Sequence, residues 1–145
     1  MMGRHELREQ VFRLLFREEF HSAEDMALQR QQFEENLPAE EDRPAISEAD
    51  AVYITERCAR IEKELVRIDR IINDNTEGWD TGRMGKVELT VLRLAVYEIV
   101  CDEDIPDAVA INEAVEIAKQ YGQESSGAFV NAVLGKVSRA NERNT

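Results

Sequence analysis

The last third of the chain constrains the fold most, because it contains three helix-forming stretches together with the residues that separate them. Residues 86–102 are apolar nearly all round a helix, which is typical of a buried central helix. Pro106 fits the first turn of the next helix, and Gly122 fits a left-handed residue that ends it. A final helix then begins at Ser125 or Ser126.

The first half of the chain predicts further helices. Residues 4–20 carry apolar residues at helical spacing, and Ser22 can cap a second helix over 23–36. Ser47 starts a long helix to about Asp74, along which apolar residues recur at alternating spacings of four and three. This stripe consists of Ile54, Cys58, Ile61, Leu65, Ile68 and Ile72. Six positions are too few to claim a coiled-coil dimer, so packing within a bundle is the simpler interpretation.

Two stretches predict connections between these helices. Residues 37–46 contain prolines and acids and are expected to form an exposed loop, and residues 73–85 contain three glycines. Trp79 lies in the second connection and is expected to hold it against the core. The tail over 138–145 is expected to be frayed. No stretch alternates with period two, so the sequence predicts an all-α, compact bundle of six or seven helices, with a single domain over 1–145.

The charge of the chain limits how it can meet nucleic acid. Its net charge of −12 repels a polyanion at long range, which argues against a self-sufficient nucleic-acid binder. Residues 24–50 carry nine acids against two arginines, whereas residues 1–21 balance four arginines against four acids. Any nucleic-acid surface is therefore expected at the N-terminal helix.

No pattern in the sequence predicts catalysis or metal binding. His5 and His21 are too far apart for an i, i+4 ligand pair, and phosphate-binding and nucleophile motifs are absent. Cys58 and Cys101 lie far apart among apolar residues and are expected to be reduced. We therefore expect no enzyme, no metal and no cofactor. No apolar run is long enough for a membrane span and the N-terminus lacks an apolar signal core, which predicts a cytoplasmic protein without membrane contact.

Three charged residues on the apolar helix need separate explanations. Arg93 and Glu98, if buried, must be paired, and their spacing on one helix predicts that each meets another element. Glu88, near the start of that helix, is expected at the surface, where an acid favours the helix dipole.

A specific series of residues runs through the second half of the chain. Its members are Trp79, Arg83, Leu92-Arg93, Ala95, Tyr97-Glu98, Pro106, VAINEAVEIAK over 109–119, Tyr121-Gly122 and FVNAVL over 129–134. In this order the series resembles the NusB family of bacterial transcription antitermination and ribosomal-RNA processing factors. The resemblance covers nearly the whole chain, is strongest over 83–134 and is weakest over 20–50.

This resemblance implies an all-helical, non-enzymatic RNA-binding protein. NusB proteins pair with ribosomal protein NusE, bind boxA RNA of ribosomal-RNA leaders and join an RNA polymerase antitermination complex. The residues that correspond by position to the RNA-binding ones are Arg4, His5, Arg8, Ser125, Ser126 and Phe129. Phe16 and Glu88 correspond to the residues that face NusE. Phe16 and Phe129 could each belong to the core instead, and a homodimer is left open.

The chain departs from the family pattern where RNA binding is concerned. Arg4 and Arg8 remain where the family often has three or more bases, Ala128 stands at a position that is often basic, and Ala132 replaces a glycine. These departures predict weak RNA affinity for the chain alone, as does its net charge. The main alternative is a helical protein–protein adaptor without RNA contact, and an enzyme with an unrecognised site is the least favoured. The same domain precedes some RNA cytosine methyltransferases, but in a chain that ends at Thr145 we expect no such catalytic domain.

Overall fold

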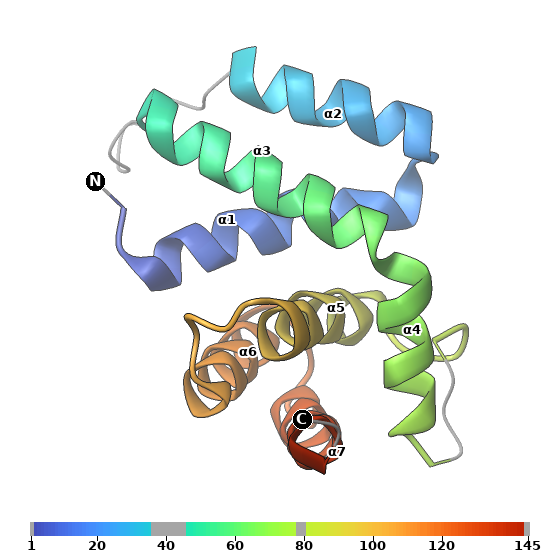
Figure 1. The fold of residues 1–145 in the computed structure, drawn as a ribbon. Helices are drawn as coiled ribbons and strands as arrows, with labels where there is room; N and C mark the ends of the chain where they lie inside the picture. Colours follow the sequence, from blue (N-terminus) through green and yellow to red (C-terminus); the bar gives the residue numbers. More distant parts are fainter. Residues whose placement is uncertain (1, 36–45, 78–80, 144–145) are drawn as a thin grey trace. The chain divides into compact units, whose positions relative to one another are not determined.

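The computed structural model describes residues 2–35, 46–77 and 81–143. Within these ranges it contains seven α-helices and one short 3-10 helix, and no residue in them belongs to a β-strand (Figure 1). The prediction of an all-α fold with six or seven helices is therefore confirmed. Residues 37–45 of the predicted loop, and Trp79 in the predicted connection, lie outside the described residues.

The helices divide between two compact units, Met1–Arg60 and Ile61–Thr145, which are called here the N-terminal and the C-terminal unit. The N-terminal unit holds α1 (Arg4–Phe16), the 3-10 helix η1 (Arg17–Phe20), α2 (Ala23–Glu35) and most of α3 (Glu48–Lys63). The C-terminal unit holds α4 (Leu65–Asp74), α5 (Lys86–Cys101), α6 (Asp107–Tyr121) and α7 (Ser126–Arg143). The expected single domain over 1–145 stays a prediction.

The N-terminal unit forms its helices where the predicted caps lie. The side-chain oxygens of Ser22 and Ser47 each accept a hydrogen bond from the backbone N–H three residues later, at 3.3 and 3.1 Å, as expected for helix N-caps. Between α3 and α2, the Thr55 hydroxyl donates to the Glu34 carboxylate. The buried apolar side chains of this unit include Val11, Phe12, Leu14, Leu15, Met26, Phe33, Ile54 and Cys58.

Helix α5 is the central element of the C-terminal unit, as its apolar circumference predicted. It packs against α4, α6 and α7, and residues 89–99 are buried apart from Arg93. Because three helices surround it, no wide face of α5 is left for polar residues.

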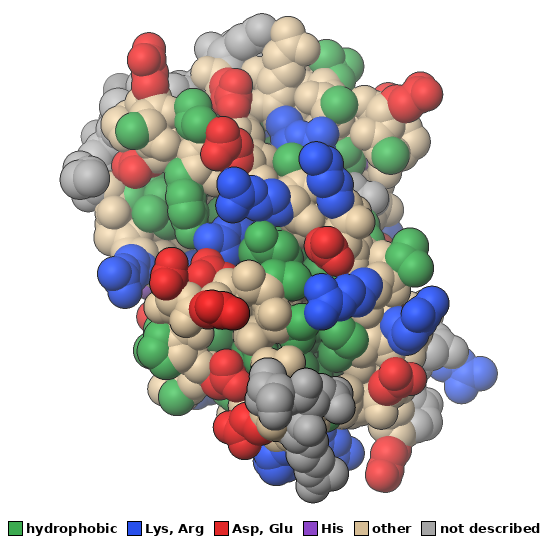
Figure 2. All heavy atoms as spheres, in the orientation of Figure 1, with side chains coloured by type: hydrophobic (Ala, Val, Ile, Leu, Met, Phe, Trp, Pro, Cys, Tyr) green, Lys and Arg blue, Asp and Glu red, His purple; other side chains and the backbone are tan. Residues whose placement is uncertain are grey.

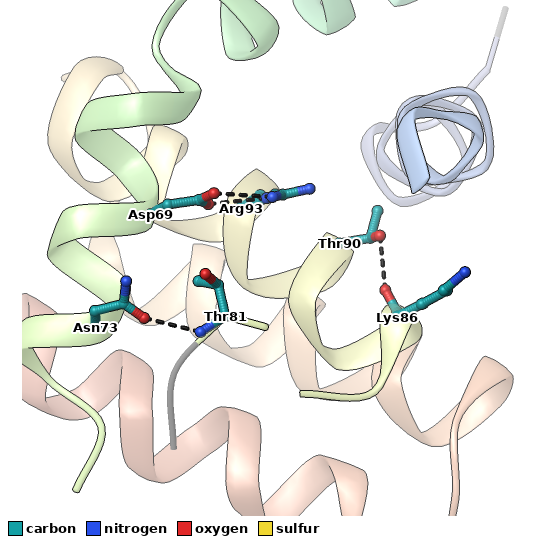
Figure 3. Close-up of polar contacts among 6 residues, drawn as sticks. All are labelled: Asp69, Asn73, Thr81, Lys86, Thr90 and Arg93. Carbon is teal, nitrogen blue, oxygen red and sulfur yellow. Dashed lines mark hydrogen bonds and ion pairs between the residues drawn. The ribbon is translucent and has the colours of Figure 1, made fainter. Parts of the chain in front are cut away.

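Arg93 finds its partner on another helix, which confirms the prediction made for it. Its Nε and Nη2 atoms donate to Oδ1 and Oδ2 of Asp69 on α4, at 2.9 and 2.8 Å (Figure 3). Such a two-bond contact between guanidinium and carboxylate is both strong and directional. Nearby, the side-chain oxygen Oδ1 of Asn73 accepts the backbone N–H of Thr81 at 2.9 Å, which ties the α4–α5 connection to the end of α4.

The single long helix predicted over 47–74 is wrong, because the chain turns at Glu64. This residue has φ −101° and ψ 8°, and it separates α3 from α4. Ile61 and Ile68 are nonetheless both buried, so the apolar spacing continues through the turn. Neither glycine nor proline marks the break, and apolar periodicity alone cannot reveal it.

The ends of α6 differ in detail from the prediction. Pro106 lies just before the first helical residue, as the N-cap in an extended conformation, and not within the first turn. Gly122 ends the helix with φ −100° and ψ −157°, which is extended and not left-handed. A positive φ is therefore not the reason for this glycine.

The expected frayed tail is wrong for residues 138–143, which continue α7. Ser138 Oγ donates to Asp107 Oδ2 at 2.5 Å, and Asn141 Nδ2 donates to the Ile99 carbonyl oxygen at 3.3 Å. These two bonds hold the last turns of α7 against α6 and α5.

Replacement of Ser138 by alanine is expected to lower the free energy of unfolding by about 1 kcal/mol, because the Asp107 carboxylate loses a hydrogen-bond donor. Urea unfolding followed by circular dichroism measures this difference. Lys136→Ala, an exposed position on the same helix, is the control and should change stability little. An unchanged midpoint for Ser138→Ala would show that this bond does not hold the end of α7.

Candidate functional site

A cavity of about 640 Å³ lies in the C-terminal unit where α5 begins, α6 ends and α7 begins. Figure 1 shows these three helices grouped within that unit. The lining residues are Met84, Gly85, Lys86, Val87, Glu88, Tyr121, Gly122, Gln123, Ser125, Ser126 and Phe129. Two stretches distant in sequence, 84–88 and 121–129, thus supply the walls, and the second includes the connection between α6 and α7.

The polar centre of this cavity is a hydrogen-bonded pair. Ser126 Oγ donates to Glu88 Oε1 at 2.5 Å and accepts the backbone N–H of Gln123 at 2.9 Å. Ser126 is only 1% exposed, whereas Glu88 is half-buried. The hydroxyl therefore donates to a residue of α5 and accepts from a residue of the α6–α7 connection. It links these two segments.

The chemistry of the walls suits a planar aromatic ligand. Met84, Val87, Tyr121 and Phe129 supply apolar and aromatic surface, and Phe129 is half-buried. An aromatic side chain that is partly exposed can stack on an unpaired base. Lys86 and Glu88 give the lining one charge of each sign, so it carries no excess positive charge for a phosphate group.

The residues predicted from the sequence are only partly brought together. Ser125, Ser126 and Phe129 line this cavity, and so does Glu88, although it was expected to face a different partner. Ser125 is exposed, whereas the burial of Ser126 suits it to support the connection. Sequence reasoning missed Met84, Tyr121 and Gln123, because only the fold shows that they share one cavity.

The basic residues of α1 differ in their access to solvent. Arg4 is exposed and His5 is half-buried, whereas Arg8 is only 8% exposed. A phosphate contact requires an accessible guanidinium, so Arg4 is the better candidate of the two arginines. Arg13, which is also exposed on α1, is a further cation that was not among the predicted site residues.

Phe16 lies in a row of three aromatic rings in the N-terminal unit. Its ring centroid is 5.9 Å from that of Phe12 and 5.5 Å from that of Phe20, the latter in an edge-to-face arrangement. Phe12 is buried, Phe16 is half-buried and Phe20 is 59% exposed. The row therefore leads from the core to the surface, and Phe20 is an exposed aromatic residue that sequence reasoning missed. Its spacing of four residues from Phe16 was an available signal.

The charges on one face of the molecule are mixed. On the face shown in Figure 2, Lys and Arg side chains lie interspersed with those of Asp and Glu.

Among the described residues, no group of three or more histidines, cysteines or carboxylates is placed to hold a metal ion. In the same part of the chain, no helix has the length and apolar character needed to cross a membrane.

Comparisons with known proteins agree on one family. Residues 5–139 match the model of the NusB family. A transcription antitermination protein NusB from Agathobacter rectalis is 46% identical over 137 residues, which cover 93% of this chain and 98% of the relative. The protein of the same name from Lachnoclostridium phytofermentans is 42% identical over 136 residues, covering 94% and 98%.

Solved structures show the same fold. The structure of T. maritima NusB has a TM-score of 0.80 and 37% identity, and the match covers 95% of this chain and 92% of that one. A crystal structure of antitermination factors NusB and NusE in complex with dsRNA contains a chain with a TM-score of 0.75. It is 24% identical, and 96% of this chain and 99% of that chain are covered. At this identity, the likeness is one of fold alone.

Proposed function

The chain belongs to the NusB family, and from this premise we propose that it pairs with ribosomal protein NusE and binds boxA RNA of ribosomal-RNA leader transcripts. It is a transcription antitermination factor and not an enzyme. In this role it joins the RNA polymerase antitermination complex and supports ribosomal-RNA transcription and maturation. Such a role places it in the cytoplasm, where transcripts and ribosomal proteins meet.

The observation that carries the RNA part of this proposal is the cavity beside Phe129. Its aromatic and apolar walls, with the exposed Ser125 at their edge, offer a base both a stacking surface and hydrogen-bonding groups. By itself, the N-terminal unit offers the exposed Arg4 on α1 for a phosphate contact.

The charge of the chain supports a shared RNA site. With a net charge of −12 and Arg8 buried, this chain contributes only about two or three phosphate contacts. Each contact with single-stranded RNA adds about −0.7 to the slope of log affinity against log salt, so the slope for this chain is near −2. NusE then supplies the remaining contacts, and Phe16, Phe20 and Glu88 form the surfaces that meet it.

Fluorescence anisotropy with a labelled boxA RNA, measured across a salt series with and without NusE, tests the proposal. We expect weak binding and a shallow salt slope for the chain alone. With NusE we expect tighter binding, a steeper slope and a preference for boxA over a scrambled RNA of equal length. The preference for boxA is the decisive result, because phosphate contacts alone carry no sequence information.

The second candidate function is a helical adaptor that binds proteins without touching RNA. The burial of Arg8 and the exposure of Phe20 favour it, because a half-exposed aromatic surface is typical of protein interfaces. Equal affinity for boxA and scrambled RNA in the presence of NusE would support the adaptor and contradict the RNA role.

A further inference from the structure

Two glycines lie beside the Glu88–Ser126 pair at places where a side chain would collide with it. A Cβ atom at Gly85 would collide with Glu88 Oε2, and one at Gly122 would lie 2.6 Å from Ser126 Oγ and 2.8 Å from the Ala118 carbonyl oxygen. The backbone φ angles are −60° and −100°, which other residues adopt freely. Lack of space, and not backbone conformation, therefore favours glycine at both positions. At Gly85 the neighbour is the movable Glu88 carboxylate, and at Gly122 the neighbours are Ser126 and the Ala118 backbone.

The hydrogen bonds of this pair pass from one segment to the next. Glu88 lies in the first turn of α5, Ser126 is the first residue of α7, and Gln123 lies in the connection between α6 and α7. The buried Ser126 is bonded to both of the others, so two hydrogen bonds connect Glu88 to Gln123. We call Glu88, Ser126 and Gln123 the latch.

We propose that Glu88 is a positioning residue for RNA binding, which acts through the latch by holding the α6–α7 connection in place. This inference rests on the proposed RNA function and assigns Glu88 a second task beside its expected contact with NusE. Ser125 directly precedes Ser126, and the backbone N–H of Phe129 donates to the Ser125 carbonyl oxygen at 3.2 Å, so the placement of both lining residues depends on the latch. Glu88 therefore affects RNA affinity even when NusE is absent.

The latch needs an acceptor at position 88 and not a negative charge. The amide oxygen of glutamine can accept the Ser126 hydroxyl proton as the carboxylate does, whereas alanine cannot. Without that acceptor, the buried hydroxyl loses a bond that water cannot replace easily. Glu88→Gln is therefore expected to restore most of the affinity that Glu88→Ala loses.

The test compares RNA affinity of the full chain without NusE, at low salt, where phosphate contacts are strongest. Glu88→Ala, Ser126→Ala and Gly85→Ala should each bind boxA RNA roughly three- to tenfold more weakly. Gly85→Ala leaves Glu88 in the sequence and displaces only the end of its flexible side chain. Glu116→Ala, which removes an exposed acid on α6, is the control for loss of charge.

The pattern among the variants decides the proposal. The double variant Glu88→Ala with Ser126→Ala should bind no more weakly than either single variant, because both remove the same connection. The latch would be overturned by any of three results: additive losses of RNA affinity in the double variant, wild-type RNA affinity in Ser126→Ala, or RNA binding by Glu88→Gln as weak as by Glu88→Ala.

Amide hydrogen exchange at Gln123 separates the latch from the RNA function. We expect faster exchange in Glu88→Ala and Gly85→Ala but not in Glu88→Gln, because the Gln123 N–H donates to Ser126. If the wild-type protein shows no boxA preference with NusE, the proposed function fails, and this exchange pattern still decides whether the latch exists. Unchanged exchange at Gln123 in all variants would overturn the latch alone.

Discussion

Replacement of Phe16 and Phe20 together by alanine is expected to weaken binding to NusE by roughly 30- to 1000-fold, as for aromatic residues at the centre of an interface. The two rings lie in edge-to-face contact, and Phe20 is 59% exposed, so a partner can cover both. Covering them removes apolar surface from water, and truncation forfeits that gain. Titration calorimetry of the variant against NusE measures the loss.

The single variants separate a contact role from a structural role. Phe20→Ala should leave the free energy of unfolding nearly unchanged, because most of its ring is already in water. Leu28→Ala, which truncates another exposed apolar residue of the same unit, is the matched control and should bind NusE as the wild type does. If the double variant binds NusE normally, the aromatic row serves only the packing of the N-terminal unit.

The parts of the fold that depend on local chemistry were predictable from the sequence. Ser22 and Ser47 cap their helices as expected, since a cap needs only a side-chain oxygen next to the first turn. The apolar circumference of α5 likewise indicated its central place. For Arg93, the sequence showed that a partner on another element was needed, but only the packing of α4 on α5 identifies Asp69 as that partner.

The errors arose where tertiary contacts decide the local structure. The turn at Glu64 interrupts a helix without glycine or proline, while buried isoleucines keep their spacing on both sides. Gly122 was expected to have a positive φ, the usual reason for glycine at a helix end, whereas a Cβ atom there would instead collide with Ser126 and the Ala118 carbonyl oxygen. The end of α7 is ordered by Asp107 and Ile99, which lie far away in sequence.

The candidate site was predictable only in part, and through the family resemblance instead of local chemistry. Ser125 and Phe129 were expected at an RNA-binding site through the family resemblance, and they do line the cavity. Tyr121 and Gln123 could not be added without the fold, because their proximity to α5 depends on how α6 and α7 pack against it. The link from Glu88 to Ser126 joins residues 38 positions apart, which no spacing pattern predicts.

Replacement of Phe129 by leucine is expected to weaken binding of boxA RNA, in the presence of NusE, by roughly five- to hundredfold, because a base loses its stacking partner. Leucine keeps most of the apolar contact, so the free energy of unfolding should fall by less than about 1.5 kcal/mol. Anisotropy and urea unfolding of the same preparation measure the two quantities.

Val130→Ala supplies the comparison that distinguishes stacking from packing at Phe129. Val130 is fully buried on α7, so its truncation should lower the stability and leave the RNA affinity nearly unchanged. If Phe129→Leu behaves like Val130→Ala, with lost stability and retained affinity, Phe129 is a core residue and the cavity does not bind a base. If Phe129→Leu loses affinity and keeps stability, the half-buried ring contacts RNA. The two variants replace adjacent residues of one helix. A general disturbance of α7 therefore cannot explain a loss of RNA affinity with retained stability in Phe129→Leu alone.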